Sequence, residues 1–324
     1  MPPIIIATRG SQLALAQANA VLGACRKEFP KLEFQLKIIK TTGDKLQSKA
    51  PPAPGTLPGR ALFTKELETA LLEKRADLAV HSLKDLPTDL PGGLQLTAVA
   101  GHREDVRDVL IYRIDKGLAP GQELPNFPSG FTVATGSLRR QTQLLALRPD
   151  FRAVSIHGNV PTRLQKLAGN PDLDATILAV AGLNRLGYSI TRAGMLHREG
   201  QLLKLAACVF EASQMLPCVG QGAIGLEIRE GDAHLSEICA GLNDQPTFQC
   251  VLAERSFLQT MGGGCQTPIG AYASTGVKVI HLRAVAFLDK KVGRAEGEDV
   301  LANAESLGRA VAGQILRQMS QPTR

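Results

Sequence analysis

Residues 131–147 read FTVATGSLRRQTQLLAL, and this stretch decides the fold class. Its first five residues are mostly apolar or β-branched, which favours a buried strand. A Gly-Ser turn follows, and apolar residues then recur at helical spacing over 138–147. A strand that passes through a short turn into a helix is the repeating unit of an α/β protein.

The same order recurs along most of the chain. Further strand-like segments lie at 4–9, 34–39, 76–80, 152–156 and 174–180, and helical patterns follow at 12–27, 64–75 and 162–168. Thr64 is the expected N-cap of the second of these helices. This alternation predicts an α/β protein with mainly parallel sheets.

The end of the chain has a different pattern. A helix is predicted around 246–260, strand-like sequence follows at 277–288, and a final helix is predicted at 302–318. This predicts a third, smaller α+β unit. The chain is expected to cross between domains near 100–105, and the Pro/Gly-rich residues 48–59 are predicted to form a mobile loop or lid. The expected domains are 1–100 with 221–240, then 101–220, then 241–324.

Composition excludes several classes of protein. Of the 324 residues, 44% are hydrophobic, which is enough to build real cores. Aromatic residues make up 4% with no Trp, which argues against a binder of single-stranded nucleic acid. No apolar run approaches the roughly 18 residues of a membrane span. The first residues, MPPIIIATR, are expected to begin a strand and lack the features of a secretory signal.

The cysteines show neither CxxC pairing nor zinc-like spacing with histidine. They are expected to be free and mostly buried thiols in a reducing cytosol. The chain carries them at Cys25, Cys208, Cys218, Cys239, Cys250 and Cys265. The formal net charge of +7 indicates an anionic partner without naming it.

Basic residues follow most of the predicted strands. In an open α/β sheet the carboxyl ends of the strands and the helix N-termini face the ligand crevice. Arginine forks at that edge suit several carboxylates or phosphates. For any one of these residues alone an ordinary surface position is the better explanation, but together they predict a crevice for a polyanion. They are Arg9, Lys84, Arg139, Arg140, Arg163, Arg185 and Arg229.

The segment HSLKD at 81–85 allows two interpretations. Ser82 and Asp85 have the spacing of a capping box, in which Ser82 would cap a helix and Asp85 would return the hydrogen bond. Asp85 beside Lys84 at a helix start could instead stabilise a cation or relay a proton. The residues themselves leave both interpretations open.

The segment MGGGCQTP at 261–268 is the most unusual in composition. Three glycines allow a tight, exposed turn or a close approach of the backbone to a ligand. A cysteine on such a turn is accessible, so Cys265 is either a reactive or modified thiol or a plain turn thiol.

The chain resembles the porphobilinogen deaminase family over nearly its whole length. The matching segments occur in the family's order, and VHSLKD, LAVAGLNRL and GGGCQTPIG are the most specific of them. They are ATRGSQLALAQ (7–17), TTGDK (41–45), LFTKELE (62–68), VHSLKDLPT (80–88), REDVRD (103–108), SLRRQ (137–141), GNVPTRLQKL (158–167), ILAVAGLNRLG (177–187), LPCVGQGAIGLE (216–227), AER (253–255) and GGGCQTPIG (262–270).

This resemblance implies a fold and a reaction. It implies two α/β domains that hinge like type II periplasmic binding proteins around the active cleft, and a small α+β third domain. It implies a dipyrromethane cofactor joined by a thioether to Cys265. Four porphobilinogen molecules would each lose ammonia and add head-to-tail, and hydrolysis would release hydroxymethylbilane. Each pyrrole carries an acetate and a propionate, which would account for the many arginines.

Roles follow from the resemblance position by position. Asp85 matches the catalytic aspartate. The positions that match cofactor contacts are Ser82, Lys84, Thr135, Ser137, Arg139, Arg140, Asn159, Arg163 and Gln221. The positions that match substrate contacts are Arg9, Ser11, His157 and Arg185, and Arg229 matches a cleft position. His157 stands where the family usually has arginine, and an imidazole is expected to bind a carboxylate less well. Residues 188–215 look longer than in the family's compact form.

Two other functions are compatible with parts of the pattern. A non-enzymatic anion-binding protein of the same two-domain fold would need neither Asp85 nor a tethered cofactor. The effector domain of a DNA-binding regulator would fit the net charge, but the sequence contains no helix-turn-helix segment. The resemblance favours a cytoplasmic, monomeric enzyme with a small-molecule substrate, no metal, and no nucleic-acid or membrane partner.

Overall fold

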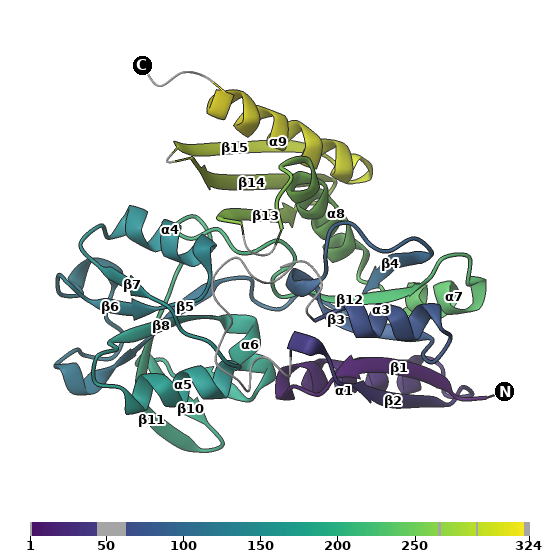
Figure 1. The fold of residues 1–324 in the computed structure, drawn as a ribbon, viewed down its shortest axis with the longest axis horizontal. Helices are drawn as coiled ribbons and strands as arrows, with labels where there is room; N and C mark the ends of the chain where they lie inside the picture. The colour runs from purple at the N-terminus through teal and green to yellow at the C-terminus, as the bar shows by residue number, and fades with distance from the viewer. Residues whose placement is uncertain (1, 44–62, 265–266, 290, 321–324) are drawn as a thin grey trace.

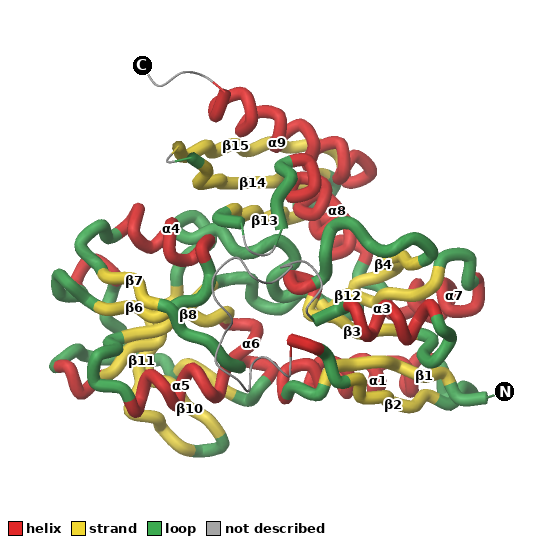
Figure 2. The backbone as a smooth tube through the Cα atoms, in the orientation of Figure 1, coloured by secondary structure: helices red, strands yellow, loops and turns green. Residues whose placement is uncertain are grey.

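The computed structural model describes residues 2–43, 63–264, 267–289 and 291–320. In these residues the strands form a five-stranded, a seven-stranded and a three-stranded sheet, which helices cover (Figures 1 and 2). The predicted α/β class with a smaller third unit is confirmed. The prediction of mainly parallel sheets is wrong, because most neighbouring strands in the described residues pair antiparallel. The predicted lid at 48–59 and Cys265 lie outside the described residues. None of the helices in the described ranges has the length and apolar character needed to span a membrane.

The first sheet gathers strands from both the beginning and the later part of the chain. Its order is β2-β1-β3-β12-β4, with the first three strands parallel and β12 antiparallel to both of its neighbours. Its elements are β1 (Ile4–Arg9), α1 (Gln12–Glu28), β2 (Phe34–Ile39), α3 (Lys65–Leu72), β3 (Leu78–Ser82), the 3₁₀ turn η1 (Leu83–Asp85), β4 (Leu94–Val99), β12 (Ile224–Arg229) and α7 (Ala233–Leu242).

The second sheet mixes parallel and antiparallel strands. In the order β7-β6-β8-β5-β11-β10-β9, only β7, β6 and β8 run parallel. The long segment near 188–215 supplies β9, β10 and β11, so it widens this sheet by an antiparallel meander. The elements are β5 (Asp108–Arg113), η2 (Ile114–Lys116), η3 (Leu124–Asn126), β6 (Thr132–Ala134), α4 (Leu138–Leu147), β7 (Arg152–Val154), α5 (Val160–Gly169), β8 (Ala175–Ala179), α6 (Val180–Arg185), β9 (Tyr188–Ile190), β10 (Met195–Arg198) and β11 (Gln201–Val209).

Two segments cross between these sheets. The chain passes from β4 to β5 through residues 100–107 and returns from β11 to β12 through residues 210–223. The two crossings approach closely at Gly222, which adopts φ +84° and where a Cβ would lie 2.4 Å from the Glu104 carbonyl oxygen. Only glycine fits this position without moving one crossing away from the other.

The third sheet is an antiparallel meander packed against two helices. Apolar side chains of α8, α9 and the inner face of the sheet share one core, which includes Phe257, Leu282 and Val311. The two helices and the one strand predicted from the sequence agree with α8, α9 and β14 to within a few residues, whereas β13 and β15 were not predicted. The elements are α8 (Gln245–Thr260), β13 (Ile269–Thr275), β14 (Val279–Leu288), β15 (Lys291–Val300), η4 (Leu301–Asn303) and α9 (Ala304–Ser320).

Candidate active site

The segment after β3 places the candidate aspartate. Leu83 is buried and its N–H donates to the Ala223 carbonyl, which fixes the start of η1 beside the returning crossing. Asp85 ends this turn. Among the described residues the Ser82 side chain makes no capping hydrogen bond to η1, so the capping-box interpretation of HSLKD is wrong. The Ser82 hydroxyl and Asp85 carboxylate are therefore not committed to a capping box.

Two predicted cofactor-binding arginines are bound to a carboxylate that sequence reasoning missed. Arg139 Nη1 lies 2.7 Å from Asp108 Oδ2, and Arg140 Nη2 lies 2.8 Å from Asp108 Oδ1. Gln221 Nε2 donates to Asp108 Oδ1 at 2.9 Å. Burial alone would raise the pKa of Asp108, but the two guanidinium groups outweigh burial and hold this pKa far below its usual range. The two arginines place positive charge near the site, but several of their N–H donors already bind Asp108 and main-chain carbonyl groups.

Two more predicted residues are helix N-caps, Ser137 and Asn159, and a third, Thr135, supports the first of them. Ser137 accepts from the Arg140 N–H, and the Thr135 hydroxyl accepts from the Ser137 N–H at 3.2 Å. Asn159 Oδ1 accepts from the N–H of Thr162 at 2.9 Å. These contacts shape the ends of β6 and the start of α5, so each residue has a structural task whatever it binds.

Lys84, Arg140 and Arg163 concentrate positive charge around Asp85. Burial lowers the pKa of Lys84, with the neighbouring Asp85 opposing the shift and Arg140 reinforcing it. Burial and the charge of Arg140 lower the pKa of Arg163 to about 10, with Asp85 again opposing. Cations that are desolvated together in this way favour an anionic ligand, which would relieve their mutual repulsion.

The predicted substrate-binding residues lie on both sides of the domain junction. Ser11 caps α1, accepting from the Ala14 N–H at 3.3 Å, and α1 contacts α6 of the other domain. Arg9 stacks on Phe63, with the guanidinium carbon 4.1 Å from the ring centroid. Arg185 ends α6, and its Nη2 donates to the Gly222 carbonyl at 2.6 Å. Burial lowers the pKa of Arg185.

Two further predicted residues differ in their positions: His157 lies beside the turn at Gly136, where a Cβ would come within 4.0 Å of its Nε2, and Arg229 lies away from the site. His157 is exposed, with Nδ1 3.4 Å from the Ser155 hydroxyl. Arg229 was expected in the cleft, and this expectation is wrong. Because β12 runs antiparallel to β3, its end lies at the opposite edge of the sheet, where Arg229 pairs with Asp77 and Asp232 at 3.2 Å each.

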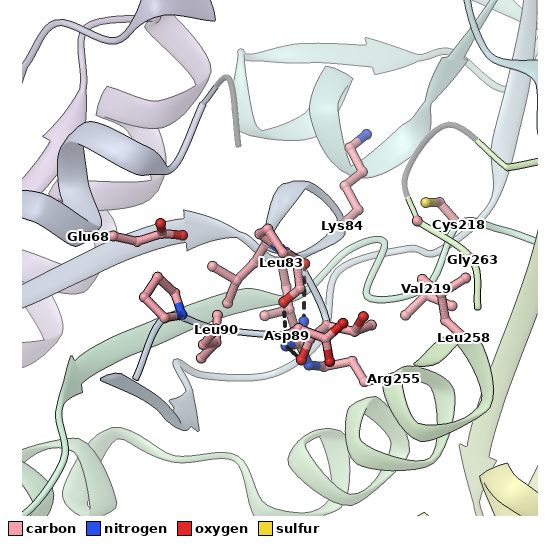
Figure 3. A pocket seen from close by; sticks show the side chains of 15 residues that line it. Glu68, Leu83, Lys84, Asp89, Leu90, Cys218, Val219, Arg255, Leu258 and Gly263 are labelled. Atoms are coloured by element: carbon pink, nitrogen blue, oxygen red, sulfur yellow. Dashed lines mark hydrogen bonds between the residues drawn. The ribbon is translucent and has the colours of Figure 1, made fainter. Parts of the chain in front are cut away.

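A cavity of about 340 Å³ opens beside Lys84 (Figure 3). Its walls are mainly apolar and come from the loop after Asp85, from Cys218 and Val219 of the returning crossing, and from the end of α8. Gly263 and Gly264 line it, and Cys265 follows them outside the described residues. Its charged lining residues are Lys84 and Arg255 with Glu68 and Asp89, so Lys84 is the cation that it offers a carboxylate, while Arg255 donates to main-chain carbonyls. A mainly apolar cavity with such a cation fits a flat organic ring that carries carboxylates.

Several contributors escaped the sequence analysis. Asp108 stands in REDVRD directly before a strongly apolar strand, and an acid at that place could have been flagged as a partner for the double arginine. Cys218 lies near Lys84 and Arg139, and burial raises the pKa of its thiol. The five cysteines that the structure describes are free thiols, as predicted.

Comparison with known sequences decides the family. The model described as "Porphobilinogen deaminase, dipyromethane cofactor binding domain" matches residues 4–237, and the one described as "Porphobilinogen deaminase, C-terminal domain" matches residues 248–317. The chain belongs to the porphobilinogen deaminase family. The family models confirm the resemblance stated from the sequence, including the dipyrromethane cofactor.

Family members of known name cover almost the whole chain. The porphobilinogen deaminase of Syntrophobacter fumaroxidans is 41% identical over 315 residues, covering 97% of this chain and 94% of that protein. The Thermus thermophilus porphobilinogen deaminase is 39% identical over 321 residues, covering 98% and 97%. Among solved structures, an ancestral arginine-binding protein bound to arginine is 12% identical, covers 75% of this chain and 91% of its own, and has a TM-score of 0.37.

Proposed function

We propose that this chain is a transferase that condenses four porphobilinogen molecules head-to-tail onto a bound dipyrromethane, with loss of ammonia, and then hydrolyses the product to hydroxymethylbilane. This reaction belongs to tetrapyrrole biosynthesis. The observation that carries the proposal is the group of partly buried cations around Asp85, beside a cavity that leads to Gly264. Family membership supplies the identity of the anionic ligand.

The cofactor would be attached through a thioether to Cys265. The residues fit such a group, because Lys84 in the cavity lining offers charge to its carboxylates and the apolar wall offers a surface for its rings. Arg163 does not line the cavity, but it lies near Asp85 and Arg140 and adds positive charge there. When bound, the dipyrromethane supplies the nucleophilic pyrrole carbon. The other proposed contacts are Ser82, Thr135, Ser137, Arg139, Arg140, Asn159 and Gln221. Arg139 and Arg140 act mainly through charge, because Asp108 engages their forks.

Asp85 is the proposed catalytic residue. A carboxylate at the end of a short turn, flanked by Lys84, can accept hydrogen bonds from pyrrole N–H groups and stabilise positive charge that develops on the ring. It can also hold the proton that the leaving amine needs. Both tasks require an acceptor that stays at a fixed distance from the reacting ring.

The incoming substrate's acetate and propionate would meet residues of both α/β domains. Arg9 and Ser11 approach from the end of β1 and the start of α1, and Arg185 approaches from α6. His157 offers an imidazole in place of a fork. Because these residues belong to different domains, closing the junction would bring them onto one ligand, which favours binding before reaction.

The remaining expectations stay proposals. The membership of each strand in a sheet supports division into 1–100 with 221–240, 101–220 and 241–324, since β12 joins the first sheet and α8 begins the third unit. We propose that the protein works as a monomer in the cytoplasm, without a metal and without nucleic-acid partners. Within the described residues no cluster of His, Cys, Asp and Glu side chains suits a metal ion.

An intact-mass measurement tests the proposed function most directly. Protein made in cells that synthesise porphobilinogen should exceed the sequence mass by one dipyrromethane, and acidified Ehrlich's reagent should colour it. A Cys265→Ser variant should show neither signal. Purified protein should also convert porphobilinogen to hydroxymethylbilane with release of ammonia. A bare mass with no turnover would contradict the proposal and favour a binding protein of the same fold.

A further inference from the structure

The turn that carries Asp85 has little rigidity of its own. Residues Leu83–Asp85 form a single 3₁₀ turn, closed by a hydrogen bond from the Leu86 N–H to the Leu83 carbonyl at 3.1 Å. Such short turns have poor hydrogen-bond geometry and depend on their surroundings. The N-terminal side is held by the Ala223 carbonyl, which accepts from the Leu83 N–H. Whatever holds the C-terminal side therefore helps to decide where Asp85 sits.

Arg255 of α8 holds that side. Its Nη1 donates to the Leu86 carbonyl at 3.1 Å, and its Nη2 donates to the Pro87 carbonyl at 2.6 Å and the Thr88 carbonyl at 3.3 Å. The residue is 8% exposed, so water competes little for these carbonyl groups. A planar fork with several donors can bind successive carbonyls at once, which the single ammonium of a lysine does less well. One turn further along α8, Gln259 Nε2 donates to Asp89 Oδ1 at 2.7 Å.

The same helix leads into Gly263 and Gly264, the last described residues before Cys265, which we call the cofactor-attachment segment. After α8 ends, the Gly263 N–H still donates to the Leu258 carbonyl, and Gly263 and Gly264 line the cavity beside Lys84. Arg255 lines the same cavity (Figure 3), and so does Leu86. One rigid helix thus binds the loop after Asp85 on its side and carries the attachment segment at its end. The distance between the two is set through α8.

We propose that Arg255 is a positioning residue for Asp85: by tying residues 86–88 to α8, it fixes the separation between the aspartate and the cofactor-attachment segment. This proposal rests on the proposed function. Loss of the fork should leave Asp85 and the cofactor present but poorly aligned. Because misplacement by about 1 Å costs roughly 100-fold in rate, the defect should appear in kcat and hardly in KM.

Arg148 provides a matched control. It also grips main-chain carbonyls of a single loop, donating to Leu124 at 2.7 Å and Phe127 at 2.8 Å, and its side chain is 14% exposed. It follows the far end of α4, on the outer side of the second domain. Removing either arginine leaves unsatisfied carbonyls and should lower Tm, but only Arg255 is next to the loop that carries Asp85.

The test compares Arg255→Ala, Arg255→Lys, Arg148→Ala and Arg148→Lys with the unmodified protein. For each, kcat, KM, Tm and the dipyrromethane-loaded fraction by intact mass are measured. We expect Arg255→Ala to carry the cofactor and to lose roughly 10- to 100-fold in kcat, with KM within about threefold. Arg255→Lys should recover part of the loss. Both Arg148 variants should keep kcat within about twofold while Tm falls.

The possible failures are distinguishable. If the unmodified protein neither carries a dipyrromethane nor turns over, the proposed function fails. If it is active and Arg255→Ala behaves like Arg148→Ala, the positioning proposal is overturned. It is also overturned if the lost activity only follows the lost cofactor, or if kcat and KM change together. Should Arg255→Ala fail to fold, Arg255→Lys decides: unchanged kcat contradicts the proposal, and lower kcat with unchanged KM supports it.

Discussion

Position 157 shows how a single side chain can limit recognition of a carboxylate. His157 is exposed, and an imidazole is shorter than an arginine side chain and lacks the guanidinium fork that can bind a carboxylate through two hydrogen bonds. We expect His157→Arg to lower KM for porphobilinogen by up to about fivefold. An exposed ion pair contributes up to about 1 kcal/mol of binding free energy, which corresponds to that change. Steady-state kinetics at pH 7 to 8 measure this change. His234→Arg, on the remote and exposed face of α7, is the control. An unchanged KM and kcat would count against a substrate contact at 157.

Replacing Asp85 by asparagine should separate charge from shape. The amide keeps the size of the carboxylate but can neither hold a proton nor balance a cationic ring. We expect Asp85→Asn to reduce kcat by roughly 100-fold or more while Tm stays within a few degrees. Intact mass establishes whether the cofactor is present, and Asp172→Asn at an exposed site serves as the control. Turnover within about threefold of the unmodified protein would refute a catalytic role.

At the scale of single residues, the sequence predicted which charged residues lie at the site better than it predicted which residues they pair with. The positions of Lys84 and Arg163 after predicted strands placed both in the ligand crevice. In the structure both lie close enough to Asp85 for its charge to affect their pKa values. The double arginine was predicted to bind an anionic ligand, and the structure shows that Asp108 engages both guanidinium groups. That pairing joins residues 31 and 32 positions apart, which no local pattern can reveal. The capping box failed because three residues of 3₁₀ turn follow Ser82 in place of an α-helix.

Among the elements, the order of strands and helices was predictable, and their direction was not. Periodicity marks a buried strand but carries no information on whether its neighbour runs parallel. The returning strand β12 therefore looked like the others, and Arg229 at its end was assigned to the wrong edge of the sheet. The meander β9-β10-β11 was likewise seen only as extra length.

Helix α3 carries a buried acid that the proposed reaction does not use. Glu68 is 6% exposed, and burial, with the nearby charge of Glu227, raises the pKa of its carboxyl group. A raised pKa contributes stability below the pKa of the unfolded chain, and that contribution is lost as pH rises through the folded value. Glu68→Gln cannot ionise and should therefore gain stability relative to the unmodified protein as pH rises.

We expect Glu68→Gln to raise Tm by about 2 to 4 °C at pH 8 and by less at pH 5. The shift at pH 8 corresponds to a gain of roughly 1 kcal/mol in the free energy of unfolding. Thermal unfolding followed by circular dichroism at the two pH values measures the difference. Glu73→Gln, on the exposed end of the same chain segment, should show no such pH dependence. An equal effect of Glu68→Gln at both pH values would show that the carboxyl group is not protonated in the fold.

For the whole molecule, one buried ion pair joins the two crossings to the third domain. Arg103, on the first crossing, lies 2.7 Å from Glu254 Oε1 and donates its Nε–H to the Gln221 carbonyl on the second crossing. Glu254 of α8 also accepts from the Gly220 N–H at 2.8 Å and from the Ala273 N–H at 2.9 Å. The carboxylate is fully buried. Both Nη groups of Arg103 donate to this carboxylate, so with Gly220 and Ala273 its four donors come from three parts of the chain that are far apart in sequence.

Breaking this pair from one side should cost more than removing both charges. Glu254→Gln leaves the Arg103 guanidinium buried without its counter-charge, and such changes cost about 3 to 5 kcal/mol. At roughly 2 to 4 °C per kcal/mol we expect Tm to fall by about 10 °C. Arg103→Met combined with Glu254→Gln should lose less than the sum of the two single changes, because neither partner is then left as an unpaired charge.

The exposed pair of Arg309 and Glu305, at 3.6 Å on α9, gives the comparison, and Glu305→Gln should change stability by less than about 0.5 kcal/mol. Differential scanning calorimetry of the loaded proteins separates the cases. If Glu254→Gln were as mild as Glu305→Gln, the three domains would have to be held together by their apolar contacts, and Arg103 would find its counter-charge elsewhere. A large loss that the double change partly restores means that the two crossings and α8 are fixed to one another by Glu254, so the separation of the Asp85 turn from the attachment segment depends on this carboxylate as well as on Arg255.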